Sequence, residues 1–107
     1  MKSITSAEER KHMSDGRVSH LICEEEISHV KFFSHVTLEG DQEVKYHEHH
    51  GEYEIYYILS GEGVYSDNGA ETIVKAGDVT YTPSGKGHSL KTIDGKKVEF
   101  VAAIVVE

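Results

Sequence analysis

One short stretch of the chain holds two histidines a single residue apart, a spacing that can bind a metal ion. A strand would place His47 and His49 on one face, with Cα atoms ~6.5 Å apart and both imidazoles able to reach one ion at ~2.1 Å. Glu54 follows a glycine-containing break that can turn its carboxylate toward the same point. His88 follows a glycine-rich turn at the start of a later strand and would complete the set. Three imidazoles and one carboxylate suit Mn, Fe, Co, Ni, Cu or Zn.

The alternative is that these histidines are surface or packing residues and that the His-x-His pair arose by chance. Neighbouring polar residues have open roles too. Lys45 shares the strand face of the pair and could bind an anionic substrate, or be an ordinary solvated residue. Tyr56 has inward parity and could hydrogen-bond inside the fold, or simply pack. His35 could serve as an acid–base group or lie at the surface, whereas His50 points away and is expected at the rim.

The elements that must position these side chains are short and rich in β-branched and aromatic residues. Ten glycines and one proline separate them, which is typical of an all-β sandwich or barrel. The Asn68-Gly69 pair predicts a tight hairpin, because both residues tolerate positive φ. Nine or ten strands would be enough to close a small barrel. We expect strands over residues 18–22, 27–38, 44–49, 54–59, 64–66, 72–75, 79–82, 88–92 and 98–106.

The N-terminal segment has a different pattern. Ser6 and Glu9 fit a capping box, which predicts a short helix over residues 7–14 that ends before Gly16. The alternative is a flexible polar arm. We therefore expect an N-terminal arm over residues 1–17, followed by one β-barrel domain over residues 18–107.

Charge and composition narrow the classes of partner. The 107-residue chain has 11 Lys and Arg against 19 Asp and Glu, a net charge of −8, which disfavours nucleic acids and anionic membrane surfaces. No apolar run approaches the ~20 residues of a membrane span, and the N-terminus lacks the apolar region of a signal peptide. Cys23 is the single cysteine and cannot form an internal disulfide. We therefore expect a cytoplasmic protein.

Two glycine-framed motifs surround the candidate ligands. They read Gly40-x6-His47-x-His49-x4-Glu54-x6-Gly61 and, after 15 residues, Gly77-x5-Pro83-x-Gly85-x2-His88-x3-Thr92. This pattern closely resembles the two motifs of the cupin superfamily, apart from one extra residue in the first gap and Thr92 where Asn is usual. The resemblance implies a jelly-roll barrel, a double-stranded β-helix, with one divalent transition metal held by His47, His49, Glu54 and His88.

The resemblance leaves two classes of function open. Cupins of this design include dioxygenases, decarboxylases, isomerases and lyases, so a metal-dependent enzyme acting on a small molecule is the first expectation. The alternative is a non-catalytic, metal-containing module that binds or senses a small molecule. Both arginines, Arg10 and Arg17, precede the motifs. A bidentate arginine for a carboxylate substrate would therefore have to come from the N-terminal arm or a partner subunit.

The last strand predicts a homodimer. From Phe100 to Val106 it is apolar on both faces, whereas one face of a strand in a one-domain barrel should contact water. A second copy of the chain would cover the extra face. The alternative is that the N-terminal arm covers it within one monomer.

Overall fold

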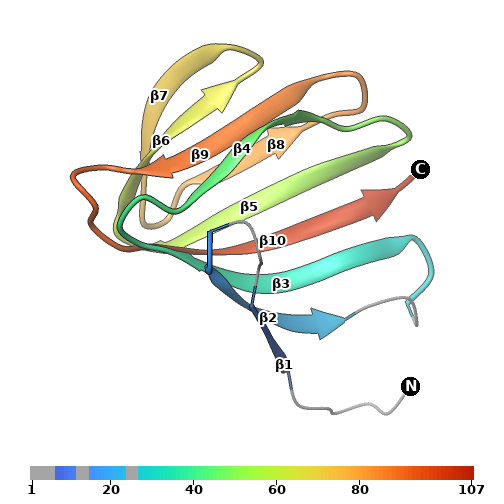
Figure 1. Cartoon of the computed structure of the whole chain (residues 1–107). Helices are drawn as coiled ribbons and strands as arrows, with labels where there is room; N and C mark the ends of the chain where they lie inside the picture. Colours follow the sequence, from blue (N-terminus) through green and yellow to red (C-terminus); the bar gives the residue numbers. More distant parts are fainter. Residues whose placement is uncertain (1–6, 12–14, 24–26) are drawn as a thin grey trace.

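A computed structural model describes residues 7–11, 15–23 and 27–107 of the chain. Ten strands and no helix occur among these residues. All strand pairs are antiparallel, and the strands form a six-stranded sheet and a four-stranded sheet (Figure 1). The strands are β1 (Glu8–Lys11), β2 (Val18–Cys23), β3 (Val30–Leu38), β4 (Glu43–Glu48), β5 (Glu52–Ser60), β6 (Glu62–Asp67), β7 (Ala70–Lys75), β8 (Val79–Thr82), β9 (Gly87–Thr92) and β10 (Val98–Val106).

The two sheets face each other as a jelly roll, as the sequence predicted. The larger sheet has the order β1-β2-β3-β10-β5-β8 and the smaller one β4-β9-β6-β7. The chain crosses from β5 to β6, and so between sheets, at Gly61. This residue has φ +78°, and a Cβ there would overlap the backbone carbonyl of Lys97. Only glycine therefore fits this corner.

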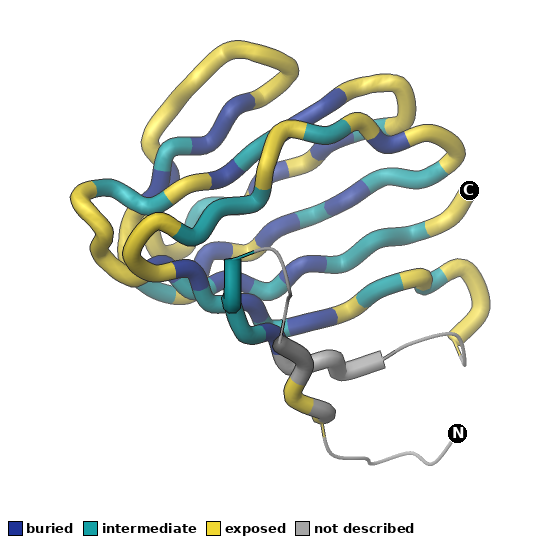
Figure 2. Tube along the Cα trace, viewed as in Figure 1, coloured by how far each residue is buried: buried dark blue, intermediate teal, exposed yellow. Residues whose placement is uncertain are grey.

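The core lies between the sheets and follows strand alternation. Along β5 every second residue is buried, and the same alternation appears on β3 and β10 (Figure 2). Large apolar side chains contribute about 1.5–3 kcal/mol each when fully buried, so this inward face stabilises the sandwich. Its buried members are Val36, Leu38, Tyr56, Ile58, Tyr65, Val74, Leu90, Val98, Phe100 and Ala102.

The predicted N-terminal helix is wrong for the residues that the structure describes there. Glu8–Lys11 is a strand that pairs with β2, with Glu8 opposite Leu21 and Lys11 opposite Val18. A helix this short is marginal in water without an apolar face to bury, whereas β2 offers hydrogen-bonding groups along its edge. Ser6 and residues 12–14 lie outside the described residues. The division into an arm over 1–17 and a barrel over 18–107 stays a prediction.

The other predicted strands are present with small shifts at their ends. The strand expected from residue 27 begins at Val30, because residues 27–29 form a turn in which His29 has φ 68°. The β6–β7 hairpin turns at Asn68 and Gly69, both with positive φ, as predicted. No described residues form a helix with the length and apolar character needed to cross a membrane.

Candidate metal centre

The four predicted ligands come from both sheets and meet between them. His47 on β4 lies directly opposite His88 on β9, and Glu54 projects from β5 in the other sheet. His49 follows β4 in a loop that is held by backbone hydrogen bonds, from its own N–H to Lys86 and from Gly85 to its carbonyl. One ligand atom from each of the four side chains lies within 4.8 Å of the others.

The three imidazoles converge through the same ring atom. The Nε2 atom of His49 lies 3.1 Å from that of His47 and 3.2 Å from that of His88, and the His47–His88 separation is 3.2 Å. Oε1 of Glu54 lies 2.9 Å from His49 Nε2, 2.8 Å from His88 Nε2 and 3.8 Å from His47 Nε2. Atoms spaced in this way can all lie ~2.1 Å from one central ion.

Hydrogen bonds at the opposite ring nitrogen fix two of these orientations. Nδ1 of His47 donates to the backbone carbonyl of Lys45 at 2.8 Å. Nδ1 of His49 donates to Oε2 of Glu52 at 2.6 Å, and Glu52 also accepts a hydrogen bond from Lys31 at 2.8 Å. With the proton on Nδ1, the Nε2 lone pair of each ring points into the cluster, as a metal ligand requires.

His88 is fixed by hydroxyl groups instead. Its Nδ1 lies 3.0 Å from the Tyr65 hydroxyl and 2.9 Å from that of Thr82, and the two hydroxyls are 2.8 Å apart. His88 and Thr82 are fully buried. The three groups therefore satisfy one another away from water and hold the ring with its Nε2 toward the other ligands.

The charges of the cluster favour an ionised carboxylate. Burial alone would raise the pKa of Glu54, but hydrogen bonds from His47 and His88, with the charges of His88 and His49, hold it at about 2. The hydrogen bond to Glu54 raises the pKa of His47, although burial and the positive charge of Arg17 oppose this rise. Burial would also raise the pKa of Glu52, but Lys31 and His49 lower it.

This donor set fits a divalent transition metal. When the imidazoles are neutral and carry their protons on Nδ1, as metal binding requires, their Nε2 atoms are all acceptors and cannot hydrogen-bond to one another or to Glu54. A cation at their centre satisfies the lone pairs together with the Glu54 carboxylate. Imidazole and carboxylate ligands suit several first-row ions. The four residues predicted from the sequence therefore form a cluster that could hold a metal.

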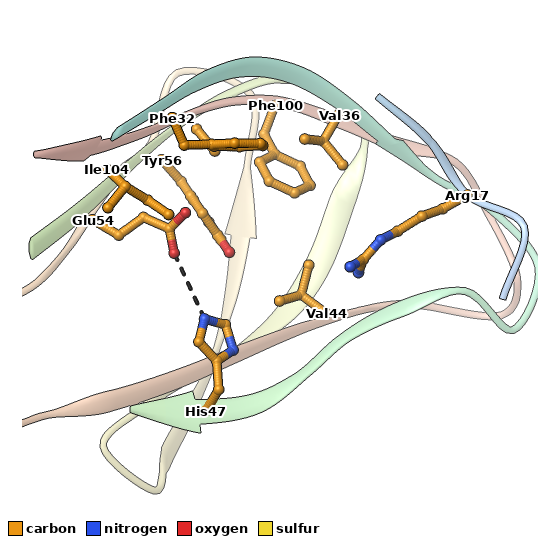
Figure 3. Close-up of a pocket in the computed structure, with 10 residues that line it drawn as sticks. Arg17, Phe32, Val36, Val44, His47, Glu54, Tyr56, Phe100 and Ile104 are labelled. Carbon is orange, nitrogen blue, oxygen red and sulfur yellow. Dashed lines mark ion pairs between the residues drawn. The ribbon is translucent and has the colours of Figure 1, made fainter. Parts of the chain in front are cut away.

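A cavity of about 150 Å³ adjoins one side of the cluster. His47 and Glu54 border it, and Tyr56 and Arg17 also line it (Figure 3). His88 is fully buried, whereas the side chain of His47 is 40% exposed, so the cluster is accessible from the His47 side. The remaining wall is apolar and consists of Phe32, Val36, Val44, Phe100, Ala102 and Ile104.

Most of the other candidate residues lie away from this cavity. Lys45 is exposed, and only its backbone carbonyl contacts the cluster. His50 is exposed at the rim, as expected, with Glu48 3.5 Å away. His35 pairs with Glu99 at 3.0 Å and is not part of the cavity lining.

Sequence reasoning missed three partners of the ligands, namely Glu52, Tyr65 and Thr82. Glu52 lies two residues before Glu54, so a regular strand places both on the same face, but this alone is weak evidence that Glu52 contacts a ligand. The two hydroxyl residues reach His88 only through the pairing of β6 with β9 and of β8 with β5, and no local pattern indicates that pairing.

Comparisons with known proteins agree with this fold. Residues 34–106 match the family described as cupin domain. The oxalate-binding protein of Thermotoga maritima is 41% identical over 90 residues, which are 83% of this chain and 74% of that protein. A crystal structure from the same organism, described as a predicted oxalate decarboxylase, is 34% identical with a TM-score of 0.76, over 95% of this chain and 93% of that one.

A more distant structure shows that the fold extends beyond close relatives. An RmlC-like cupin from Shewanella frigidimarina has a TM-score of 0.78 at 15% identity, over 94% of this chain and 85% of that one. The family match spans most of the chain and includes Glu54 and both predicted histidine motifs. This chain therefore belongs to the cupin domain family.

Proposed function

We propose that the protein binds one divalent transition metal through His47, His49, Glu54 and His88, and uses it to bind a small carboxylate such as oxalate. The observation that carries this proposal is the convergence of four ligand atoms beside a cavity on the more exposed, His47 side. Four protein ligands leave positions open on an ion that prefers six. The 41% identical relative is named for binding oxalate, which supports this class of ligand.

The residues around the cavity have separable tasks in this proposal. The bound metal would supply a Lewis-acid centre for carboxylate oxygens. Ile104 and Phe32 belong to the apolar wall and exclude water from the ligand. Burial, and then the negative charge of Glu54, raise the pKa of Tyr56 well above its ordinary value. Its hydroxyl therefore keeps its proton at neutral pH and remains a hydrogen-bond donor.

The test is titration of the untagged, metal-analysed protein with oxalate by calorimetry. We expect binding to the metal-loaded form and none to protein stripped of metal. The variant His47→Ala/His49→Ala is the control, because it removes two ligands and leaves the apolar wall intact. Metal-loaded protein that ignores oxalate would show that the ligand class is wrong.

The second candidate is a metal-dependent enzyme acting on the same class of molecule. It is favoured by the 34% identical structure, described as a predicted oxalate decarboxylase. Decarboxylation leaves a carbon atom that must take up a proton. Among the described residues that line the cavity, Tyr56 has a hydroxyl group that can donate it. Production of formate and CO₂ from oxalate by the metal-loaded protein would support this candidate, and binding without turnover would support a binding module.

We also propose a homodimer formed through the outer face of the larger sheet. Tyr57 on β5 and Val79 on β8 are opposite one another and exposed, and Tyr81 on β8 is 57% exposed. Phe33 on β3 lies opposite Ala103, which extends this apolar surface across β10. Light scattering at micromolar concentration should give twice 11.9 kDa, and Tyr81→Lys should shift the mass toward the monomer. A monomeric wild type would rule the dimer out.

The expected cytoplasmic setting belongs to this proposal too. It is supported by the single cysteine, Cys23, which leaves no pair for an internal disulfide. The net charge of −8 supports the absence of nucleic-acid and anionic-membrane partners. Electrophoretic mobility shift on duplex DNA and flotation with anionic vesicles would each detect such a partner.

A further inference from the structure

Arg17 is fixed at the cavity by the connection between β1 and β2. Its Nη1 donates to the backbone carbonyl of Glu43 at 2.7 Å. The Asp15 carboxylate accepts hydrogen bonds from the backbone N–H of Arg17 at 3.1 Å and of Glu43 at 3.2 Å. These bonds join the segment before β2 to the first residue of β4, and the guanidinium points from there toward the cavity (Figure 3).

The charge of Arg17 has no counter-ion in the part of the chain that the structure describes. Its Nε is buried without a hydrogen-bond partner, and the acceptor of its Nη1 is a neutral carbonyl. Leaving a buried donor of a charged group unpaired costs free energy. A carboxylate in the cavity would supply a counter-ion to this guanidinium, because Arg17 lines the same cavity as His47 and Glu54.

The residues that line the cavity indicate which kind of anion can bind there. Val44 lies between Arg17 and His47 in the view of the cavity (Figure 3), and most of the other lining residues are apolar. A ligand there meets positive charge at the metal site, positive charge at Arg17 and apolar groups between them. A guanidinium matches the two oxygens of a carboxylate, which a point charge does not.

We propose that Arg17 binds a carboxylate group of the ligand whose other end lies at the metal, and so selects small dicarboxylates over their neutral analogues. This inference rests on the metal site of the proposed function. It makes Arg17, which precedes both sequence motifs, a specificity-determining residue of the cavity. The competing explanation is that Arg17 only ties the β1–β2 connection to β4.

The experiment compares Arg17→Met with the wild type, both loaded with the same metal. Oxalate is the anionic probe, oxamide its neutral analogue and imidazole a neutral ligand for the open metal position. We expect oxalate binding to weaken about 10- to 100-fold, with metal content and imidazole binding unchanged. Oxamide should bind the wild type and the variant equally weakly.

Two further variants separate charge, hydrogen-bond geometry and folding. Lys75→Met removes the same charge from β7, where Lys75 is exposed and outside the cavity lining, and should bind oxalate like the wild type. Arg17→Lys keeps the charge but loses the planar fork, so its affinity should lie between those of the wild type and Arg17→Met.

The outcomes are distinguishable from failure of the proposed function. Metal-loaded wild type that binds no oxalate would overturn the proposed function itself. Wild type and folded Arg17→Met with equal oxalate affinities would overturn the role of Arg17 alone. Equal loss of oxalate and imidazole binding in Arg17→Met, together with lost metal or a lower melting temperature, would show that Arg17 is only a structural tie.

Discussion

The same strands build an apolar packed end and a polar histidine end of the sandwich. On β9, His88 and Leu90 are two residues apart, face the same way and are both fully buried. On β5, Ile58 belongs to the apolar core, whereas Glu54, four residues earlier, belongs to the ligand cluster. The backbone thus offers equivalent inward positions at both ends, and the side chains alone decide which end packs and which end binds.

The two ends are stabilised in different ways. Leu90 and its neighbours gain from removal of apolar surface from water, which requires no partner from outside the chain. The ligands are polar groups buried at a cost, which the hydrogen bonds at their Nδ1 atoms and the Glu54 carboxylate offset. Removing metal, changing pH or replacing a side chain should therefore affect the two ends unequally.

The largest expected effect is loss of the metal when the histidine end is broken. Replacement of His47 and His49 by alanine removes two of four ligands, so stoichiometric metal should be abolished. The circular dichroism spectrum should remain that of a β protein, because the packed end is untouched. Elemental analysis of the purified variant checks this. Full metal occupancy in the double variant would disprove the ligand assignment.

Breaking the packed end should give the reverse result. Leu90→Ala leaves a cavity at a fully buried position and should lower the free energy of unfolding by about 2–5 kcal/mol. Urea denaturation of the metal-free protein measures this. One metal ion per chain should still be bound by the folded fraction. If Leu90→Ala had the wild-type free energy of unfolding but bound no metal, the two ends would not be separable.

The hydroxyl groups behind His88 should have an intermediate effect. Thr82→Val keeps the shape of the side chain but removes one hydroxyl from His88 Nδ1, and should weaken metal binding about 10- to 100-fold. Tyr65→Phe should act in the same direction. Thr72→Val on β7 is the matched control, because Thr72 is exposed. Competition with a fluorescent chelator gives the affinities, and equal values for Thr82→Val and Thr72→Val would contradict this role.

How much of this was predictable from the sequence depends on how local each signal is. His47 and His49 share a face through strand alternation, and their motif also holds Glu54, so the candidate ligands and the β fold could be predicted. The helix prediction failed because a capping box is a local signal, whereas Glu8–Lys11 pairs with β2.

Features that depend on pairing between distant segments were out of reach. Tyr65 reaches His88 across 23 residues of sequence, through the register of β6 and β9. Arg17 reaches the cavity through its hydrogen bond to Glu43, which is 26 residues away. In each case the chemistry of the residue was visible in the sequence, but its position in space was set by tertiary contacts.

The smallest expected effect is an opposite pH dependence of stability in the metal-free and the metal-loaded protein, which only the histidine end should show. In the metal-free protein the pKa of His47 is raised, chiefly by its hydrogen bond to Glu54. The stability from this protonated form is complete below the ordinary pKa of ~6.5 and is lost as pH rises through the folded value. Metal binding instead requires neutral imidazoles, so the metal should stabilise more as pH rises.

The measurement is the difference in melting temperature between metal-loaded and metal-free protein. This difference should grow as pH rises from the ordinary histidine pKa of ~6.5 through the raised pKa of His47. The Glu54 carboxylate adds no step in this window, because its pKa of about 2 keeps it ionised throughout. Leu90→Ala should lower both melting temperatures and leave the trend of their difference with pH intact, because no titrating group is changed. A difference that shrinks with rising pH would mean that protons do not compete with the metal at His47.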